Sequence, residues 1–298
     1  MSTEVVKTEM DICSSRKLAE LYLRFGSVEE ALKHYPELPI SVPDFHRKIK
    51  KYGIVKGIGR RAVSLAEVLN FFAEKVLEPN FSIEKLYRRM SYSLRKSASV
   101  VTLYRIYEQM MERVVRTYAA ALVITNSDRN QILVADEKMQ NLLTGKVRGS
   151  TSLLMSFAVK DEPFYDSVLR VLQREFSTEL TLQKRLTRDG DLSKEIVSPD
   201  ISPFMYLHLL DVKVAVFHLE LPDYISENLG SFTSSYKVGG HRFMPISDLL
   251  SGDTRFNLRE GVSEIVEGFQ NYLLGTFDYP VVKNALLNEA VLALSESK

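Results

Sequence analysis

Residues 168–182 read VLRVLQREFSTELTL. We expect a helix over residues 163–180, with the apolar side chains of this stretch on its buried face. Glu175 and Glu179 are four residues apart, so on a regular helix they share one face and both could reach one divalent cation. Thr178 stands between them and supplies no negative charge. The stretch therefore allows three interpretations: an active site, a disarmed one, or an ordinary amphipathic helix.

Strand-like segments surround this helix. Two apolar runs flank the turn Asn126-Ser127-Asp128 within AALVITNSDRNQILVADE, which predicts a hairpin over residues 120–137. Strands before and after a central helix, closed by a second helix, predict an α/β/α sandwich. The remaining expected segments are strands at 151–159, 204–209 and 212–220, the stretch HRFMPISDLL at 241–250, and a last helix, REGVSEIVEGFQNYLL, at 259–274.

Arg174, Glu175, Phe176, Glu179 and Leu182 stand in the register of a longer signature, Gly-x5-Glu-x7-Arg-Glu-U-x-Glu-Glu-x-Gly-U, in which U is apolar. Through these residues, and through HRFMPISDLL before the last helix, the chain resembles the Nudix family across about residues 119–275. The resemblance implies the sandwich that the order of elements also predicts. It further implies a hydrolase whose glutamates hold Mg²⁺ or Mn²⁺ against a pyrophosphate.

The chain departs from this signature at four positions. Thr178 replaces a carboxylate, Asp166 replaces the longer upstream glutamate, and Lys160 and Thr181 replace glycines. A hard cation needs several oxygen ligands, so each lost or shortened carboxylate weakens the site. Side chains in place of glycine obstruct the close approach of the backbone. These departures favour a disarmed site.

We therefore expect no catalytic residue, no metal and no cofactor. Arg174, Glu175 and Glu179 then remain as positions that bind a ligand or support the architecture. The alternative is a Nudix-type hydrolase of a nucleoside-diphosphate derivative, with a Mg²⁺ site that has fewer carboxylates than the signature and is made of Asp166, Glu175 and Glu179.

The net charge of +1 is the sum of a basic N-terminal part and an acidic C-terminal part. Up to Tyr118 there are 21 Lys and Arg against 14 Asp and Glu, a net charge of +7, and the remaining residues have 18 against 24, a net charge of −6. Such asymmetry suggests a basic module joined to an acidic one. The basic residues are densest at 44–61 and 85–105.

Two windows of the basic part look alike: SVEEALKHYPELPISVPDFHRKIKKYG (27–53) and SIEKLYRRMSYSLRKSASVVTLYRIYEQMM (82–111). Each opens with a serine that can cap a helix, and each begins a second helix with a matched octet, ISVPDFHR (40–47) or ASVVTLYR (98–105). This pattern predicts two helix-turn-helix units, although a plain helical hairpin would have the same periodicity. The side chains expected to pack inward are Phe45, Ile49, Leu103 and Ile106.

The first unit continues as KYGIVKGIGRRAVSLAEVLNFF (51–72), in which Gly57 and Gly59 permit a tight reversal and Ser64 with Glu67 begins a further helix. It resembles MerR-like and excisionase-like winged helices, which implies that Arg60 and Arg61 grip the DNA backbone. The second unit resembles a homeodomain-like helix-turn-helix. Cations neutralise phosphates and read guanine edges, and shorter polar side chains add hydrogen bonds. The residues expected to bind double-stranded DNA are Ser41, His46, Arg47, Lys48, Lys50, Lys51, Arg60, Arg61, Lys96, Ser99, Thr102 and Arg105.

Composition excludes several classes. Cys13 is the only cysteine, so disulfides within the chain and clustered-cysteine zinc sites are excluded. No apolar run reaches the length of about 20 residues that a membrane span needs, and the first residues lack the apolar core of a signal peptide. We expect a cytoplasmic protein that does not bind membranes.

The expected fold class is α+β. A winged helix-turn-helix over 1–80 and a second helix-turn-helix with a connecting helix over 81–117 precede a Nudix-like domain over 118–298. Together they predict a homodimeric DNA-binding transcriptional regulator whose sandwich senses an effector or dimerises. Bacterial regulators that join these two kinds of domain, with ligands related to ADP-ribose and NAD, have the reverse order. The expected effector is a nucleotide-derived small molecule.

Overall fold

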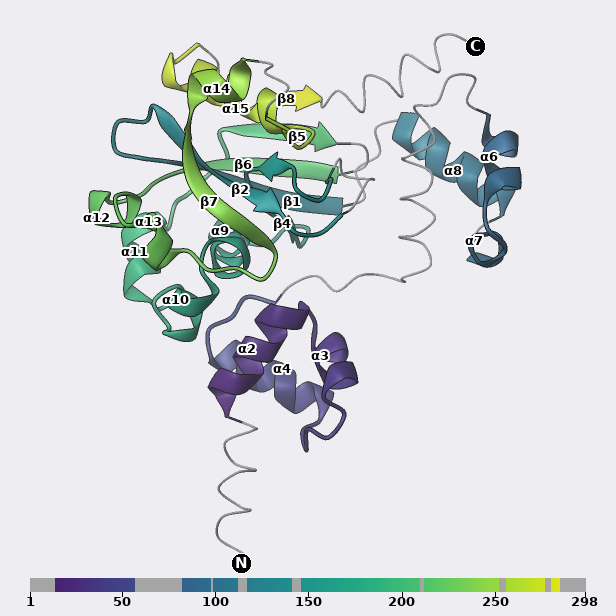
Figure 1. Ribbon diagram of the computed structural model, residues 1–298, viewed down its shortest axis with the longest axis horizontal. Coiled ribbons are helices and arrows are strands. Elements are labelled where there is room, and N and C mark those ends of the chain that lie inside the picture. The colour runs from purple at the N-terminus through teal and green to yellow at the C-terminus, as the bar shows by residue number, and fades with distance from the viewer. Residues whose placement is uncertain are drawn as a thin grey trace, which may run out of the picture.

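The computed structural model describes residues 14–56, 82–97, 99–111, 117–140, 146–209, 212–251, 256–276 and 280–284. Two groups of helices precede a sheet that is covered by helices (Figure 1). The mixed α+β class expected from the sequence is confirmed. Within the described ranges, no helix is long and apolar enough to cross a membrane.

The first group, which we call the helical module, consists of α2 (Ser15–Phe25), α3 (Val28–His34) and α4 (Val42–Lys51). Serine side chains cap all three helices, because the oxygens of Ser14, Ser27 and Ser41 accept hydrogen bonds from backbone N–H groups of the first turns. Phe45 and Ile49 are buried, as the periodicity of α4 predicts. They pack in one apolar cluster with residues of α2 and α3.

The second group consists of α6 (Ile83–Arg89), α7 (Tyr92–Ser97) and α8 (Val100–Met111). Ser82 caps α6, and the hydroxyl of Ser99 accepts a hydrogen bond from the Thr102 N–H at 3.2 Å. Leu103 is buried, as expected. The side chain of Ile106 lies outside the described part of the structure.

In the described ranges, eight strands form one mixed sheet at the centre of the C-terminal part. Strand β1 (Thr117–Thr125) pairs in parallel with β6 (Val212–Glu220) and antiparallel with β4 (Leu154–Ala158) and β2 (Gln131–Glu137). The order is β3-β2-β1-β6-β5-β8, with β4 also on β1 and β7 also on β2. The other strands are β3 (Thr151–Ser152), β5 (Met205–Leu209), β7 (Val238–Pro245) and β8 (Val281–Asn284).

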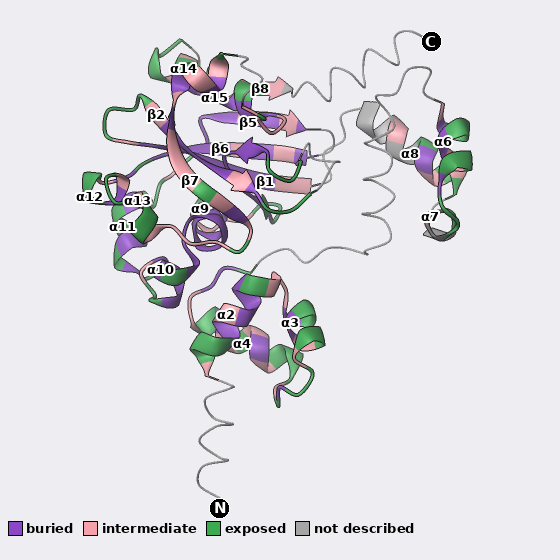
Figure 2. Ribbon diagram, viewed as in Figure 1, coloured by how far each residue is buried: buried purple, intermediate pink, exposed green. Residues whose placement is uncertain are grey.

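Helices cover both faces of this sheet, and alternate residues of β1 reach the two cores. Ala121 and Val123 pack in one apolar cluster with residues of α15, whereas Leu122 and Ile124 pack in another with residues of α9. Buried residues accordingly gather in the central strands (Figure 2). The α/β/α sandwich is therefore confirmed. Its helices are α9 (Phe164–Val171), α10 (Thr178–Leu182), α11 (Asp191–Ile196), α12 (Asp223–Ser226), α13 (Leu229–Phe232), α14 (Ile246–Leu250) and α15 (Val262–Leu273).

The segment that the sequence predicts as one helix over 163–180 is divided. Helix α9 runs into a π-helix (Leu172–Phe176), in which the Ser177 N–H donates to the Leu172 carbonyl five residues back, at 3.0 Å. Ser177 itself is extended, with φ −145° and ψ 108°, and its hydroxyl caps α10 through the Leu180 N–H. Because the helix is interrupted between Glu175 and Glu179, the regular i, i+4 relation does not apply to them.

Candidate functional site

Glu175 is almost completely buried, with 1% of its surface exposed. Its Oε2 accepts the backbone N–H of Met155 in β4 at 2.6 Å, and its Oε1 accepts the Lys237 ammonium at 3.0 Å. Burial alone would raise the pKa of Glu175, but Lys237, Lys146 and the Met155 hydrogen bond outweigh it and hold the pKa below the usual value. Both carboxylate oxygens are therefore engaged by the chain itself.

The other two carboxylates of the predicted metal site have cations of their own. Glu179 is exposed, and its Oε1 lies 3.4 Å from Arg16 Nη2 in α2. Asp166 Oδ2 lies 2.5 Å from Arg188 Nη2. The three acids thus pair with three different cations, and within the described ranges no group of three His, Cys, Asp or Glu could hold a metal ion.

A divalent cation does not fit this arrangement, because a hard cation needs several oxygen ligands around one point. The ammonium of Lys237 already occupies one oxygen of Glu175, and a backbone donor occupies the other. Thr178, at the position of the missing carboxylate, is buried, and its hydroxyl has no hydrogen-bond partner. The part of the chain that the structure describes thus gives no set of oxygens around Glu175 that could bind Mg²⁺ or Mn²⁺.

More basic side chains surround Glu175 where β2 ends and β7 begins. His241 donates through Nε2 to the Glu175 carbonyl oxygen at 2.6 Å, and burial lowers the pKa of His241. Lys138 Nζ donates to the Ser235 carbonyl at 2.7 Å, and Lys146 pairs with the buried Glu137. The residues that the sequence analysis missed are thus Lys138, Lys146, Lys237 and His241. Of the stretches that the sequence analysis connected with the signature, only HRFMPISDLL, which contains His241, lies in this region.

The helical module is docked on the helical segment that carries the signature. Gln173 is fully buried, and its side chain accepts the Val55 N–H at 2.9 Å and donates to the carbonyls of Gly53, at 2.9 Å, and Leu186, at 2.8 Å. Arg174 Nη2 donates to the Gly26 carbonyl at 3.2 Å. Arg174, a signature residue, therefore contacts the module, while the neighbouring Glu175 faces the sheet.

Further contacts extend this interface. Tyr52 donates to the Leu182 carbonyl at 2.6 Å, and Leu182 packs in the apolar cluster of the module. Arg170 Nε donates to the Lys56 carbonyl at 2.9 Å. Gly53, with φ +94°, lies so close that an added Cβ would be 2.7 Å from Thr187 Cβ. The C-terminal end of α4 and the residues after it are thus fixed to the sandwich.

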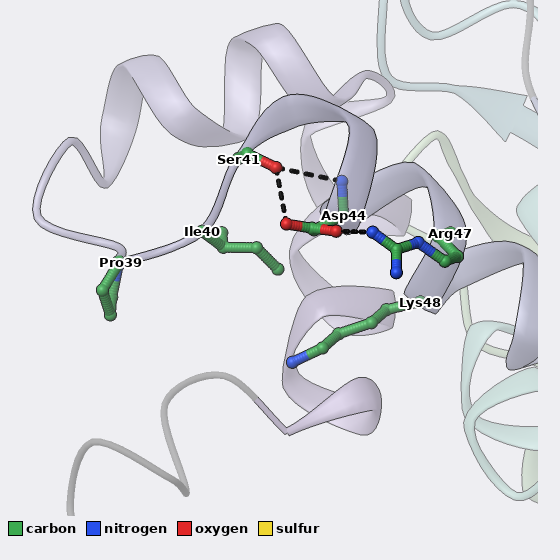
Figure 3. Close-up of a pocket in the computed structure, with 6 residues that line it drawn as sticks. All are labelled: Pro39, Ile40, Ser41, Asp44, Arg47 and Lys48. Carbon is green, nitrogen blue, oxygen red and sulfur yellow. Dashed lines mark hydrogen bonds and ion pairs between the residues drawn. The ribbon is translucent and has the colours of Figure 1, made fainter.

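Three of the predicted DNA-binding residues meet in a pocket at the start of α4. Ser41, Arg47 and Lys48 line a volume of about 220 Å³ together with Pro39, Ile40 and Asp44 (Figure 3). Ser41 donates to Asp44 Oδ2 at 2.7 Å, and Asp44 also pairs with Arg47.

The remaining predicted DNA contacts have different surroundings. Lys50 and Lys51 are exposed on α4, whereas His46 is half-buried and burial lowers its pKa. Ser99 and Thr102 cap the start of α8. Arg60 and Arg61, and with them the predicted wing, lie outside the described residues, as do the side chains of Lys96 and Arg105.

No family model matches the sequence, and a search of curated proteins found no match. Solved Nudix-fold structures are similar to parts of the chain. A Nudix hydrolase from Nitrosomonas europaea is 11% identical, covers 57% of this chain and 80% of its own, and has a TM-score of 0.37. The Nudix domain of Shewanella oneidensis NrtR, complexed with ADP ribose, is 13% identical, covers 53% and 89%, and has a TM-score of 0.35. A C. elegans Ap4A hydrolase is 13% identical, covers 54% and 99%, and has a TM-score of 0.32. Similarity at this level concerns the fold alone and assigns no activity or ligand to this chain.

Proposed function

We propose that this chain is a DNA-binding transcriptional regulator. In this proposal α4 contacts double-stranded DNA, and the sandwich holds the module without a divalent metal. The sandwich then either binds a nucleotide-derived effector or joins two copies of the chain.

The division of contacts along α4 carries the proposal. Phe45, Ile49 and Tyr52 face the module core and the sandwich, so they fix the helix in place. Arg47, Lys50 and Lys51 are exposed on the same helix. A helix anchored through one face and cationic on the other suits the phosphate backbone of a duplex, because cations both neutralise phosphates and release condensed counterions.

The ion pair of Arg47 with Asp44 does not oppose this role. The side chains are 75% and 44% exposed, and pairs between such exposed groups contribute little stability. Arg47 can therefore exchange Asp44 for a phosphate at small cost.

The ion pairs of the signature carboxylates favour the role of a sensor over that of a hydrolase for the sandwich. Glu175, Glu179 and Asp166 each have a separate basic partner, so no shared set of oxygens is available to activate water through a metal. Mg²⁺-dependent release of phosphate from a nucleoside-diphosphate derivative, abolished by Glu175→Gln, would favour the hydrolase and overturn this part of the proposal.

The test compares two double variants with the same loss of charge. Arg47→Ala/Lys50→Ala removes two exposed cations from α4, and Lys160→Ala/Lys194→Ala removes two exposed cations from the sandwich. Binding of the full chain to a labelled mixed-sequence duplex is measured by fluorescence anisotropy at low salt. We expect about a tenfold or larger loss for the α4 variant and less than a twofold change for the control. Equal losses, or no binding by the unmodified chain, would contradict the proposal.

A further inference from the structure

The turn that follows α10 places a lysine of the sandwich beside the end of α4. Lys184 Nζ lies 5.1 Å from the centre of the Tyr52 ring. Tyr52 directly follows α4 and donates to the Leu182 carbonyl at 2.6 Å, so the two side chains belong to one contact between the helical module and the sandwich. Helix α10 lies beside the module (Figure 1). A cation of the sandwich thus adjoins the helix proposed to bind DNA.

Hydrogen bonds of the turn hold the backbone of Lys184 in this place. Its φ is +64°, in the left-handed region that lysine rarely adopts. The Lys184 N–H donates to the Thr181 carbonyl at 3.0 Å, and the Thr187 hydroxyl donates to the Lys184 carbonyl at 2.9 Å. Thr187 is also the residue against which Gly53 packs. The contacts that dock the module therefore also set the position of Lys184 relative to α4.

The order of side chains around α4 leads from its exposed cations to Lys184. Tyr52 keeps right-handed helical geometry, with φ −74° and ψ −13°, so it continues the spiral of α4. At about 3.6 residues per turn, Lys48 lies roughly 40° from Tyr52 around the helix axis. Lys51 and Arg47 follow, at roughly 100° and 140° from Tyr52. Lys184, next to the Tyr52 ring, therefore extends this row of cations onto the sandwich.

Lys184 differs from the other cations near this turn, because each of those is paired with an acid. The pairs are Arg16 with Glu179, Arg185 with Asp191 and Arg188 with Asp166. In the described ranges, Lys184 is exposed and no carboxylate pairs with it. Its contact with the Tyr52 ring is of the cation–π kind, which contributes only about 0.5–1 kcal/mol at exposed sites. A phosphate can therefore bind the ammonium at small cost.

We propose that Lys184 contacts the phosphate backbone of the duplex that α4 binds, so that DNA spans the contact between the module and the sandwich. The inference rests on the proposed function and deepens it, because it adds a residue of the sandwich to the DNA-binding surface. An ammonium neutralises a phosphate and releases its condensed counterion. DNA that touches both parts also binds the docked arrangement of the module more tightly than any other, and so stabilises that arrangement.

Two variants of Lys184 and one matched control test the inference on the full chain. Lys184→Asn removes the charge, and asparagine tolerates the left-handed backbone, whereas Lys184→Arg keeps the charge. The control is Lys213→Asn on β6, because Lys213 Nζ also lies beside a tyrosine, 4.0 Å from the centre of the Tyr206 ring. Binding to a labelled mixed-sequence duplex is measured by fluorescence anisotropy at 50 and 200 mM KCl.

We expect Lys184→Asn to bind about tenfold more weakly at 50 mM KCl and about threefold more weakly at 200 mM, because salt reduces the gain from each phosphate contact. Lys184→Arg and Lys213→Asn should stay within about twofold of the unmodified chain. A loss of stability alone would not produce this dependence on salt.

A second measurement uses the unmodified chain, so it decides the matter even where Lys184→Asn fails to fold. Lysines are acetylated with an N-hydroxysuccinimide ester, with and without saturating duplex, and the products are quantified by mass spectrometry. Bound DNA should slow the modification of Lys184 at least about fivefold, because a phosphate covers the ammonium, and should leave the rate at Lys213 unchanged.

Two results would overturn the inference. One is unchanged binding by Lys184→Asn, or equal losses in Lys184→Asn and Lys213→Asn; the other is acetylation of Lys184 at the same rate with and without duplex. If Arg47→Ala/Lys50→Ala still weakens binding in that case, the DNA-binding role of α4 stands and the contact by the sandwich alone is lost. If the unmodified chain does not bind duplex DNA at all, the proposed function is lost and the inference with it.

Discussion

Replacing Gln173 by leucine should release the helical module from the sandwich. The side chain is fully buried and makes three hydrogen bonds, to Val55, Gly53 and Leu186, at 2.8–2.9 Å. Each such bond contributes about 1 kcal/mol net, and each buried group left without a partner costs about 1–3 kcal/mol where water cannot reach it. With partial access of water we expect a total loss of about 3–5 kcal/mol, a large part of the stability of a typical domain.

Two of the three bonds reach Gly53 and Val55, directly after α4, so the loss should appear first in the module that these residues hold to the sandwich. Hydrogen exchange followed by mass spectrometry should report faster exchange across α2–α4 in Gln173→Leu, with the strands of the sheet still protected. Urea unfolding gives the change in free energy. Gln183→Leu is the matched control, because Gln183 is exposed and donates only to Glu179 among the described contacts, and we expect a change within about 0.5 kcal/mol. A loss below about 1 kcal/mol in Gln173→Leu, with unchanged exchange, would refute the reasoning.

Three further variants test other contacts. Lys237→Met should cost about 3 kcal/mol in urea unfolding at pH 7, because it leaves Glu175 buried as an unpaired carboxylate. Burial raises the pKa of that unpaired carboxyl, so the cost should shrink as the pH falls and the carboxyl takes up a proton; a cost independent of pH would argue against it. Burial lowers the pKa of His218 from 6.5 to about 4, so below pH 6.5 the unfolded chain binds a proton that the folded chain does not. Stability should therefore fall by up to about 3 kcal/mol between pH 6.5 and 4, and His218→Gln should remove this fall. Gly53→Ala should lower the melting temperature, with a cost of about 2 kcal/mol, because φ is +94° and the new Cβ would clash with Thr187; an unchanged melting temperature would contradict the close packing.

Local patterns were sufficient to predict the sandwich and the capped helices. Ala121 and Leu122 of β1 lie in opposite cores, and the continuous apolar run of residues 119–124 is typical of a strand that is buried on both faces. Ser27 and Ser41 cap helices, as expected for a serine directly before residues with a helical pattern of apolar side chains, because its hydroxyl accepts a backbone N–H of the first turn. The close contact of Gly53 with Thr187 of the sandwich was not predicted from the sequence.

The site depended on contacts that local patterns do not encode. The π-helix adds one residue to a turn and leaves no clear periodic signal, so the sequence predicted Glu175 and Glu179 on one regular helix. Lys237 follows Glu175 by 62 residues and reaches it through the fold of the segment before β7. Gln173 bonds to backbone groups of another part of the chain, and such partners have no characteristic sequence of their own.

The salt dependence of duplex binding tests the central claim most directly. If Arg47, Lys48, Lys50 and Lys51 contact phosphates, about four counterions are displaced, and the slope of log K against log salt should be about −3 to −4. Affinity should then fall on the order of 100-fold between 50 and 200 mM KCl. A slope near zero, or the absence of binding at 50 mM KCl, would contradict the assignment of α4 as a DNA-binding helix.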